Sequence, residues 1–213
     1  MPGMKAMPLD RAASLIDTMP LKYAAIAAIG VTTGCRISEI LALRRFDLIN
    51  PDGSFKEVIA FLKLKVKPKK QVKPKKQVKP KKQFAAKTRK IAIPVDYRNI
   101  VIRHLKQEEQ QGFERPDDFV FRGKMKKHLS RLTVYAFFRK NLGPGYGTHW
   151  MRKTFAQLIF AYFIKKNIAD PMRALELTRQ ALGHVRIDTT VKYLGIDENA
   201  ITTAQNDIFN RKK

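Results

Sequence analysis

The amino-acid sequence predicts a mainly α-helical fold with a small antiparallel β-sheet near its middle. Apolar residues recur at helical spacing over most of the 213 positions, and the pattern becomes strand-like only in two short segments, 57–65 and 90–95. Hydrophobic residues make up 44% of the chain, which is enough to bury a core. The length fits one domain, so we expect residues 1–213 to form a single unit.

Helical spacing marks several segments on both sides of the expected sheet. In chain order these segments are 9–18, 21–32, the stretch RISEILALRR that begins at residue 36, 96–111, 130–141, 149–166, 172–182 and, more weakly, 197–209. Pro20 suits the boundary between the first two helices, because proline is tolerated at a helix start and breaks a helix interior. Thr33 and Gly34 interrupt the pattern before RISEILALRR resumes it.

The two expected strands form a hairpin. The first, EVIAFLKLK, follows a Pro-Asp-Gly turn at 51–53, and the second, KIAIPV, ends at Pro94. Between them, residues 66–83 repeat VKPKKQ three times, and a proline in every six residues excludes a helix. We expect a lysine-rich loop inserted in the hairpin, which either is a solvated charge run or contacts an anionic partner.

Charge and cysteine content limit the classes of function. The formal net charge is +25, and removing the nine lysines of the repeat leaves +16. Such a balance indicates a polyanionic partner, although charge alone does not separate DNA from RNA or an anionic membrane. The single cysteine, Cys35, excludes an internal disulfide. The N-terminus lacks a signal-peptide core and the longest apolar run, near 23–31, is too short to span a bilayer, so we expect a cytoplasmic or nucleoid protein.

Three segments carry candidate functional residues. TTGCRISEILALRRFDL places Arg36 at a helix start, and GTHWMRKTFAQLIF places His149 and Arg152 three residues apart on one helix face. ALGHVRIDTTVKYLG has His184 nine residues before Tyr193. Each segment alone also fits an ordinary structural role. The candidates gain weight only as an ordered set.

In this order, and together with a lysine in a β-hairpin, the segments resemble the tyrosine recombinases of the phage-integrase type, from about residue 8 to the end. The resemblance implies the catalytic-domain fold of that family and a site-specific recombinase that cleaves and rejoins DNA through a 3′-phosphotyrosine intermediate. Arg36 and Arg152 would be the two phosphate-binding arginines, His149 and His184 the two site histidines, and Tyr193 the nucleophile.

The resemblance also implies a catalytic lysine in the hairpin. Lys87, in AAKTRKIAIPV, is the first candidate, and Lys90 is the alternative because the repeat enlarges the hairpin. Tyr146 competes with Tyr193 for the nucleophile, since it lies near the HxxR segment in sequence. One departure is Lys153, where family members usually carry histidine.

Physical chemistry supports these roles independently. Fixed guanidinium groups stabilise the charge that develops on a phosphate under attack. A phenol with a pKa of about 10 must lose its proton to attack, and the departing DNA oxygen needs a proton donor such as lysine. The sequence has no paired cysteines, HExxH, clustered carboxylates or GxxxxGK[ST], so we expect no metal, no cofactor and no ATP.

The resemblance further implies a double-stranded DNA site as partner and a homotetramer on paired sites. We expect a single catalytic domain in which the family's N-terminal core-binding domain is absent and residues 197–213 form a tail helix. A type IB topoisomerase, a telomere resolvase and a non-catalytic basic DNA-binding protein remain the alternatives.

Overall fold

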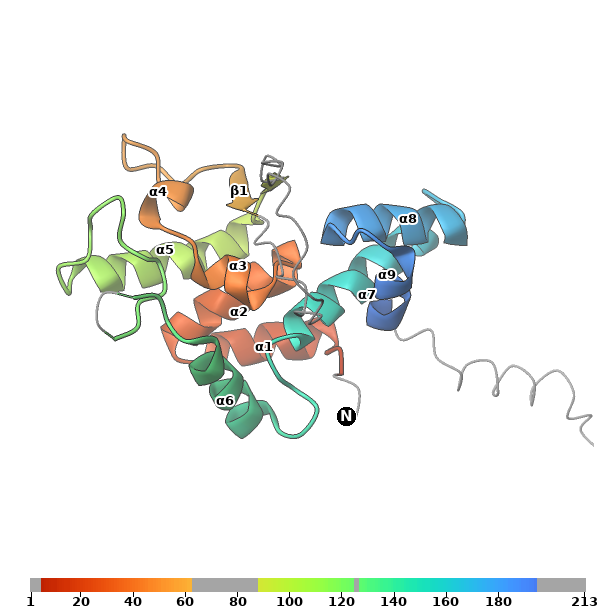
Figure 1. Ribbon diagram of the computed structural model, residues 1–213, viewed down its shortest axis with the longest axis horizontal. Coiled ribbons are helices and arrows are strands. Elements are labelled where there is room, and N and C mark those ends of the chain that lie inside the picture. The colour runs from red at the N-terminus through yellow and green to blue at the C-terminus, as the bar shows by residue number, and fades with distance from the viewer. Residues whose placement is uncertain (1–4, 63–87, 125–126, 195–213) are drawn as a thin grey trace, which may run out of the picture.

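The computed structural model describes residues 5–62, 88–124 and 127–194, and the prediction of a mainly helical fold with a small antiparallel sheet is confirmed (Figure 1). Within these ranges the helices are α1 (Leu9–Thr18), α2 (Leu21–Thr33), α3 (Ile37–Leu41), α4 (Arg45–Leu48), α5 (Val95–Glu109), α6 (Arg131–Leu142), α7 (Trp150–Lys165), α8 (Pro171–Leu182) and α9 (Ile187–Leu194). The strands are β1 (Ile59–Leu62) and β2 (Thr88–Ile91).

The two strands pair as an antiparallel ladder. Phe61 lies opposite Arg89, and Ile59 lies opposite Ile91. Ile59 and Phe61 are buried, and side chains alternate between the two faces of a strand, so these four positions share the inner face. The second strand ends at Ile91, before its predicted limit at Pro94, and Pro94 directly precedes the first residue of α5. The repeat 66–83 lies outside the described residues.

Local sequence sets the ends of the two helices that flank the site. At the end of α2, Gly34 adopts a left-handed conformation with φ of 61°, which glycine accepts without steric cost. The start of α8 is fixed by the Asp170 carboxylate, which accepts hydrogen bonds from two backbone N–H groups, and by Pro171 at the first helical position. Gly183 ends α8 in the same left-handed conformation.

Buried apolar side chains form two clusters of unequal size. The larger one surrounds α2, which is buried along most of its length, and draws on α1, α3, α5, α6, the sheet and the start of α7; we call these elements the main lobe. The smaller cluster consists of Phe155, Ala156, Leu175, Leu182 and Leu194 from α7, α8 and α9. We call α8 and α9 the C-terminal lobe. Figure 1 shows α7 running from one lobe to the other.

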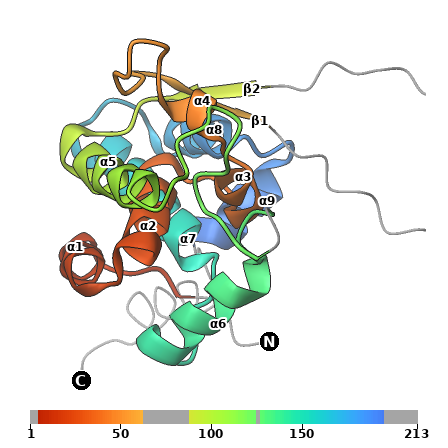
Figure 2. The same cartoon turned by 90° about the vertical axis from the view of Figure 1, so that its left-hand side faces the viewer.

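The hairpin and α6 lie at opposite ends of the main lobe, as the view in Figure 2 shows. Helix α2 lies between them and packs against both α5 and α7. This arrangement brings the C-terminal end of α2, the hairpin and the start of α7 to the side of the main lobe that faces the C-terminal lobe.

The sequence did not predict α9. Its residues, IDTTVKYL, include four β-branched side chains, which have weak helix propensity, and the segment is only eight residues long. Packing stabilises it instead: Leu194 is buried in the small cluster, and Ile187 and Val191 pack against that cluster. The weaker helix predicted over 197–209 lies outside the described residues.

Candidate active site

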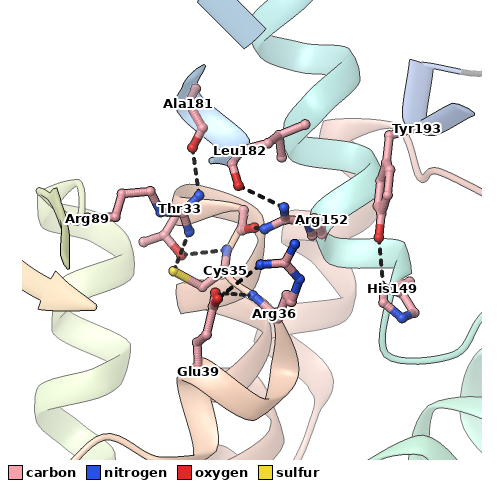
Figure 3. Close-up of polar contacts among 11 residues, drawn as sticks. Thr33, Cys35, Arg36, Glu39, Arg89, His149, Arg152, Ala181, Leu182 and Tyr193 are labelled. Carbon is pink, nitrogen blue, oxygen red and sulfur yellow. Dashed lines mark hydrogen bonds and ion pairs between the residues drawn. The ribbon is translucent and has the colours of Figure 1, made fainter. Parts of the chain in front are cut away.

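Five of the six predicted site residues lie in the described part of the chain, and the structure brings them together between the two lobes. Figure 3 labels Arg36, His149, Arg152 and Tyr193. They come from the α2–α3 turn, the first turn of α7, the turn after α8, and α9. The sixth, Lys87, lies outside the described residues. Its alternative, Lys90, is exposed and occupies the face of β2 opposite to that of Arg89.

Arg36 precedes the first residue of α3 and is fixed by Glu39. The backbone N–H of Arg36 donates to the Glu39 carboxylate at 2.8 Å, and its guanidinium donates to the same carboxylate at 3.1 Å. The side chain of Glu39 is only 4% exposed, whereas that of Arg36 is 32% exposed. Part of the Arg36 guanidinium is therefore held and part is open to a ligand.

Arg152 is 1% exposed and lies in the first turn of α7. Its guanidinium donates to the carbonyl oxygen of Gly34 and, at 2.7 Å, to that of Leu182. Its Nε is buried and has no hydrogen-bond partner among the described residues. Burial, with the nearby charge of Arg36, lowers the pKa of Arg152 to about 10, so it stays cationic at neutral pH. A buried cation without a carboxylate contact creates a strong preference for an anion at this place.

Tyr193 projects from α9 toward His149. The phenol oxygen lies 3.1 Å from His149 Nδ1, and the Arg152 guanidinium carbon lies 5.6 Å from the centre of the tyrosine ring. His149 is exposed as a residue, yet desolvation of its ring and then the charges of Arg152, Arg36 and Arg131 lower its pKa. The ring is therefore neutral at pH 7, and one of its nitrogens is free to accept a proton.

His184 follows the end of α8 and is 4% exposed. Its Nδ1 lies 2.9 Å from the hydroxyl of Thr190, and its ring centre lies 5.2 Å from that of Tyr193. Burial, followed by the positive charges of Arg152, Arg36, Arg89 and Arg179, lowers the pKa of His184 to about 3. It too is neutral at pH 7.

The backbone of the His184 turn has its own support. Arg179, one turn before the end of α8, donates to the carbonyl oxygen of His184 at 2.6 Å. Glu176 accepts two hydrogen bonds from the same guanidinium, at 2.7 and 2.6 Å. Arg179 therefore reaches this turn in a fixed orientation.

Sequence reasoning missed Glu39, Arg89 and Thr190 as members of the site. Glu39 had a signal, since an acidic residue three positions after an arginine on a helix is placed to pair with it. Arg89 had a weaker one, a charged residue at an inward position of a strand. The competing tyrosine, Tyr146, is buried in the core of the main lobe, and Arg11 lies over its ring.

Comparisons with solved structures identify the fold. The XerA recombinase structure is 17% identical, with a TM-score of 0.61, over 100% of this chain and 68% of that chain. XerH bound to palindromic difH substrate is 19% identical, with a TM-score of 0.58, over 95% of this chain and 52% of that one. This is the tyrosine-recombinase catalytic-domain fold. The Tn1549 transposon integrase in complex with transposon right end DNA agrees, at 16% identity and a TM-score of 0.59, over 99% of this chain and 68% of that one.

The likeness to these recombinases is one of structure. No protein-family model matches the chain, and no curated protein sequence matches it. The chain spans between about half and two thirds of the length of the recombinases named above. Among the described residues, no helix is long and apolar enough to cross a membrane, and no group of three or more His, Cys, Asp or Glu side chains could hold a metal ion.

Proposed function

We propose that the chain is the catalytic domain of a site-specific tyrosine recombinase, which cleaves and rejoins DNA through a 3′-phosphotyrosine intermediate. The observation that carries the proposal is the position of the Tyr193 hydroxyl, 3.1 Å from the neutral ring of His149 and beside the buried cation of Arg152. The XerH and Tn1549 integrase structures contain DNA, which supports a double-stranded DNA recombination site as partner here.

In this proposal Arg36 and Arg152 bind the phosphate that is cleaved. The unpartnered Nε of Arg152 and the open part of the Arg36 guanidinium are the donors available for its oxygens. Guanidinium groups that are fixed before the reaction stabilise the charge of the transition state at little cost in reorganisation. His184 is neutral, and if its Nδ1 accepts from Thr190, its other nitrogen carries the proton and donates to the same phosphate.

The proposal also assigns the two proton transfers of the reaction. The Tyr193 hydroxyl gives its proton to His149 Nδ1 as its oxygen forms a bond to phosphorus. The bond from phosphorus to the DNA 5′-oxygen breaks, and Lys87 supplies the proton that this oxygen needs. Religation reverses these steps, so the phosphotyrosine conserves the bond energy and no ATP is consumed.

Assembly of four protomers on two paired DNA sites belongs to this proposal. It is carried over from the family resemblance, and the tail over 197–213, which we expect to join protomers, lies outside the described residues. Mixing differently tagged chains on a recombination site and measuring the mass of the complex by light scattering tests it. Complexes that stay at one protomer per DNA would contradict the tetramer.

The decisive experiment captures the covalent intermediate. The full chain is incubated, in the presence of EDTA, with duplexes of randomised sequence that carry a nick, because loss of the short fragment beside the nick traps the protein on DNA. Denaturing electrophoresis isolates the adduct, and sequencing the captured DNA yields the site. We expect an adduct with the unchanged chain and none with Tyr193→Phe.

Tyr146→Phe is the matched control, since it removes the same hydroxyl from the competing tyrosine, and it should retain the adduct. An adduct that survives in Tyr193→Phe would contradict the assignment of the nucleophile. With the captured site in hand, exchange of strands between two duplexes separates a recombinase from a topoisomerase, which would relax supercoiled DNA without exchanging strands.

A further inference from the structure

The boundary between the two lobes passes through the candidate site. Arg36 belongs to the main lobe, whereas His184 and Tyr193 belong to the C-terminal lobe. The apolar cores of the lobes are separate, and the C-terminal lobe packs mainly on α7. Because no continuous apolar core joins the lobes, contacts across the boundary must help to hold Tyr193 in position relative to Arg36.

Two arginines make parallel bridges across this boundary (Figure 3). Arg152 joins the Gly34 carbonyl to the Leu182 carbonyl. Arg89 makes the same kind of bridge one residue away on each side: it donates to the Cys35 sulfur at 2.7 Å and to the Ala181 carbonyl at 2.6 Å. The acceptors are consecutive residues in the α2–α3 turn and consecutive residues in the last turn of α8.

The chemistry of the acceptors favours arginine in both places. Carbonyl groups in the last turn of a helix lack intrahelical partners, and a cation at that end is also favoured by the helix dipole. Hydrogen bonds from a charged donor are stronger than neutral ones, and only the planar fork of arginine reaches two separate acceptors in a fixed geometry. A lysine at position 89 would keep the charge but would lack the two-armed bridge.

Arg89 differs from Arg152 in the element that carries it. Arg89 is on the inner face of β2, opposite Phe61, so its bridge joins the hairpin to the α2–α3 turn and to the C-terminal lobe. Lys87, the residue proposed to protonate the departing oxygen, precedes it by two positions in the sequence. Arg89 therefore contributes to the anchoring of the hairpin and, together with Arg152, to the register of the lobes.

We propose that Arg89 is a positioning residue, which holds the C-terminal lobe and the hairpin in register with Arg36 through its bridge between Cys35 and Ala181. The proposal rests on the proposed function for its effect on cleavage, but its effect on the lobes is independent of catalysis. This role requires no contact between Arg89 and DNA, because both hydrogen bonds of the bridge are made to protein acceptors.

The test compares Arg89→Met, Arg89→Lys and the control Arg103→Met, which removes the same charge from an exposed position on α5. Amide hydrogen exchange, measured on the full chain without DNA, reports how often the segment that carries His184 and Tyr193 separates from the main lobe. We expect Arg89→Met to raise exchange about tenfold or more in residues 183–194 while leaving α2 and α5 unchanged, with Arg89→Lys intermediate and Arg103→Met like the parent.

Cleavage of the captured site at saturating DNA is the second measurement. We expect the rate to fall about 10- to 100-fold in Arg89→Met, to recover partly in Arg89→Lys, and to stay unchanged in Arg103→Met, with similar DNA affinity for both Met variants. If Arg89→Met unfolds, the acceptor at position 35 is changed instead. Cys35→Ala removes this acceptor and Cys35→Ser replaces it with a hydroxyl. We expect Cys35→Ala to have the larger effect on both hydrogen exchange and the cleavage rate.

Each failure has a distinct signature. A parent chain that forms no covalent adduct overturns the proposed function. If the parent chain cleaves DNA, two results would overturn the role of Arg89 and leave the proposed function in place. One is unchanged hydrogen exchange in residues 183–194 of Arg89→Met, and the other is an unchanged cleavage rate of Arg89→Met. A loss of rate that simply follows melting temperature across the variants would make Arg89 a stabilising residue and overturn the positioning role.

Discussion

The main lobe and the C-terminal lobe are stabilised in different ways. The main lobe surrounds a helix, α2, whose side chains are buried along most of its length. In the described part of the C-terminal lobe and the helix beneath it, five buried side chains form the apolar cluster, and hydrogen bonds from Arg89 and Arg152 join this lobe to the main lobe. Regions with few buried apolar contacts open at lower free energy than the core does.

The proposed nucleophile, Tyr193, and His184 therefore lie on the lobe with the smaller apolar core. The main lobe supplies Arg36 on a rigid support, whereas Tyr193 and His184 depend on hydrogen bonds for their position. If that comparison is correct, damage to the boundary should affect catalysis more than global stability, and damage to the main core should do the reverse.

Arg152→Ala should give the largest effect, because it removes both a proposed hydrogen-bond donor to the phosphate and a bridge between the lobes. We expect cleavage to fall by about 10²–10³-fold or more. Leaving the Gly34 and Leu182 carbonyls unpaired should also cost about 1–3 kcal/mol of stability. Single-turnover cleavage and thermal melting measure the two losses.

Arg36→Ala is the control that sharpens this result. It removes a proposed phosphate-binding side chain that bridges no lobes, while the Glu39 carboxylate loses its cation but keeps the Arg36 backbone N–H, so we expect a comparable loss of cleavage with a smaller loss of stability than in Arg152→Ala. If Arg36→Ala and Arg152→Ala lose the same stability, the bridge of Arg152 contributes nothing to joining the lobes, and the proposed difference between the lobes is contradicted.

Gly34→Ala tests the boundary without touching a charge. A Cβ at this position would lie 2.3 Å from a ring carbon of Phe155, and the left-handed backbone adds strain. We expect a loss of about 2–4 kcal/mol, with α7 and the α2–α3 turn pushed apart. Gly53→Ala is the matched control, because Gly53 also has positive φ but nothing lies within 4 Å of its Cβ position.

Denaturant unfolding of the two glycine variants gives the measurement. Gly53→Ala should lose only the cost of the backbone conformation, about 1 kcal/mol. If the two variants lose the same stability, the close approach of Phe155 to the turn does not contribute to joining the lobes.

The pH dependence of stability should give the smallest effect. His184 has a pKa of about 3 in the folded chain and 6.5 ordinarily, because burial and the charges of Arg152, Arg36, Arg89 and Arg179 oppose protonation. Between these values the unfolded chain binds a proton that the folded chain does not, so stability is full above pH 6.5 and falls as pH drops toward 3.

His184→Asn removes this contribution, so the stability of the variant should fall less than that of the parent as the pH drops through that window. His128→Gln changes an exposed histidine and serves as the control. Denaturant melts at a series of pH values give the comparison. Identical pH profiles for the parent and His184→Asn would contradict the burial of a neutral His184.

Much of the fold could be predicted from periodicity and turn residues. Helices α1, α2, α5, α6, α7 and α8 and both strands lie where the sequence predicted them, with shifts of a few residues at their ends. Helix α9 could not be predicted, since its β-branched residues favour strands and only contacts with α7 and α8 make it helical.

The candidate site divides in the same way. The order of the motifs indicated Arg36, His149, Arg152, His184 and Tyr193, and the structure brings all five together, although their roles stay proposals. The contacts of the supporting residues Arg89 and Thr190 could not be predicted, because their partners lie on other elements or depend on a helix the sequence did not predict.

The thiol under the Arg89 bridge has a practical consequence. Cys35 is the only cysteine in the sequence, it is 1% exposed, and burial raises the pKa of its thiol, so reagents that attack thiolates should modify it slowly in the closed molecule. Modification then requires the turn to separate from Arg89 and the end of α8. The rate at which a small thiol reagent modifies Cys35 therefore measures how often the boundary between the lobes opens. If DNA binds between the lobes, as proposed, it should lower this rate. The native cysteine serves as the probe, so no label site has to be added to the chain.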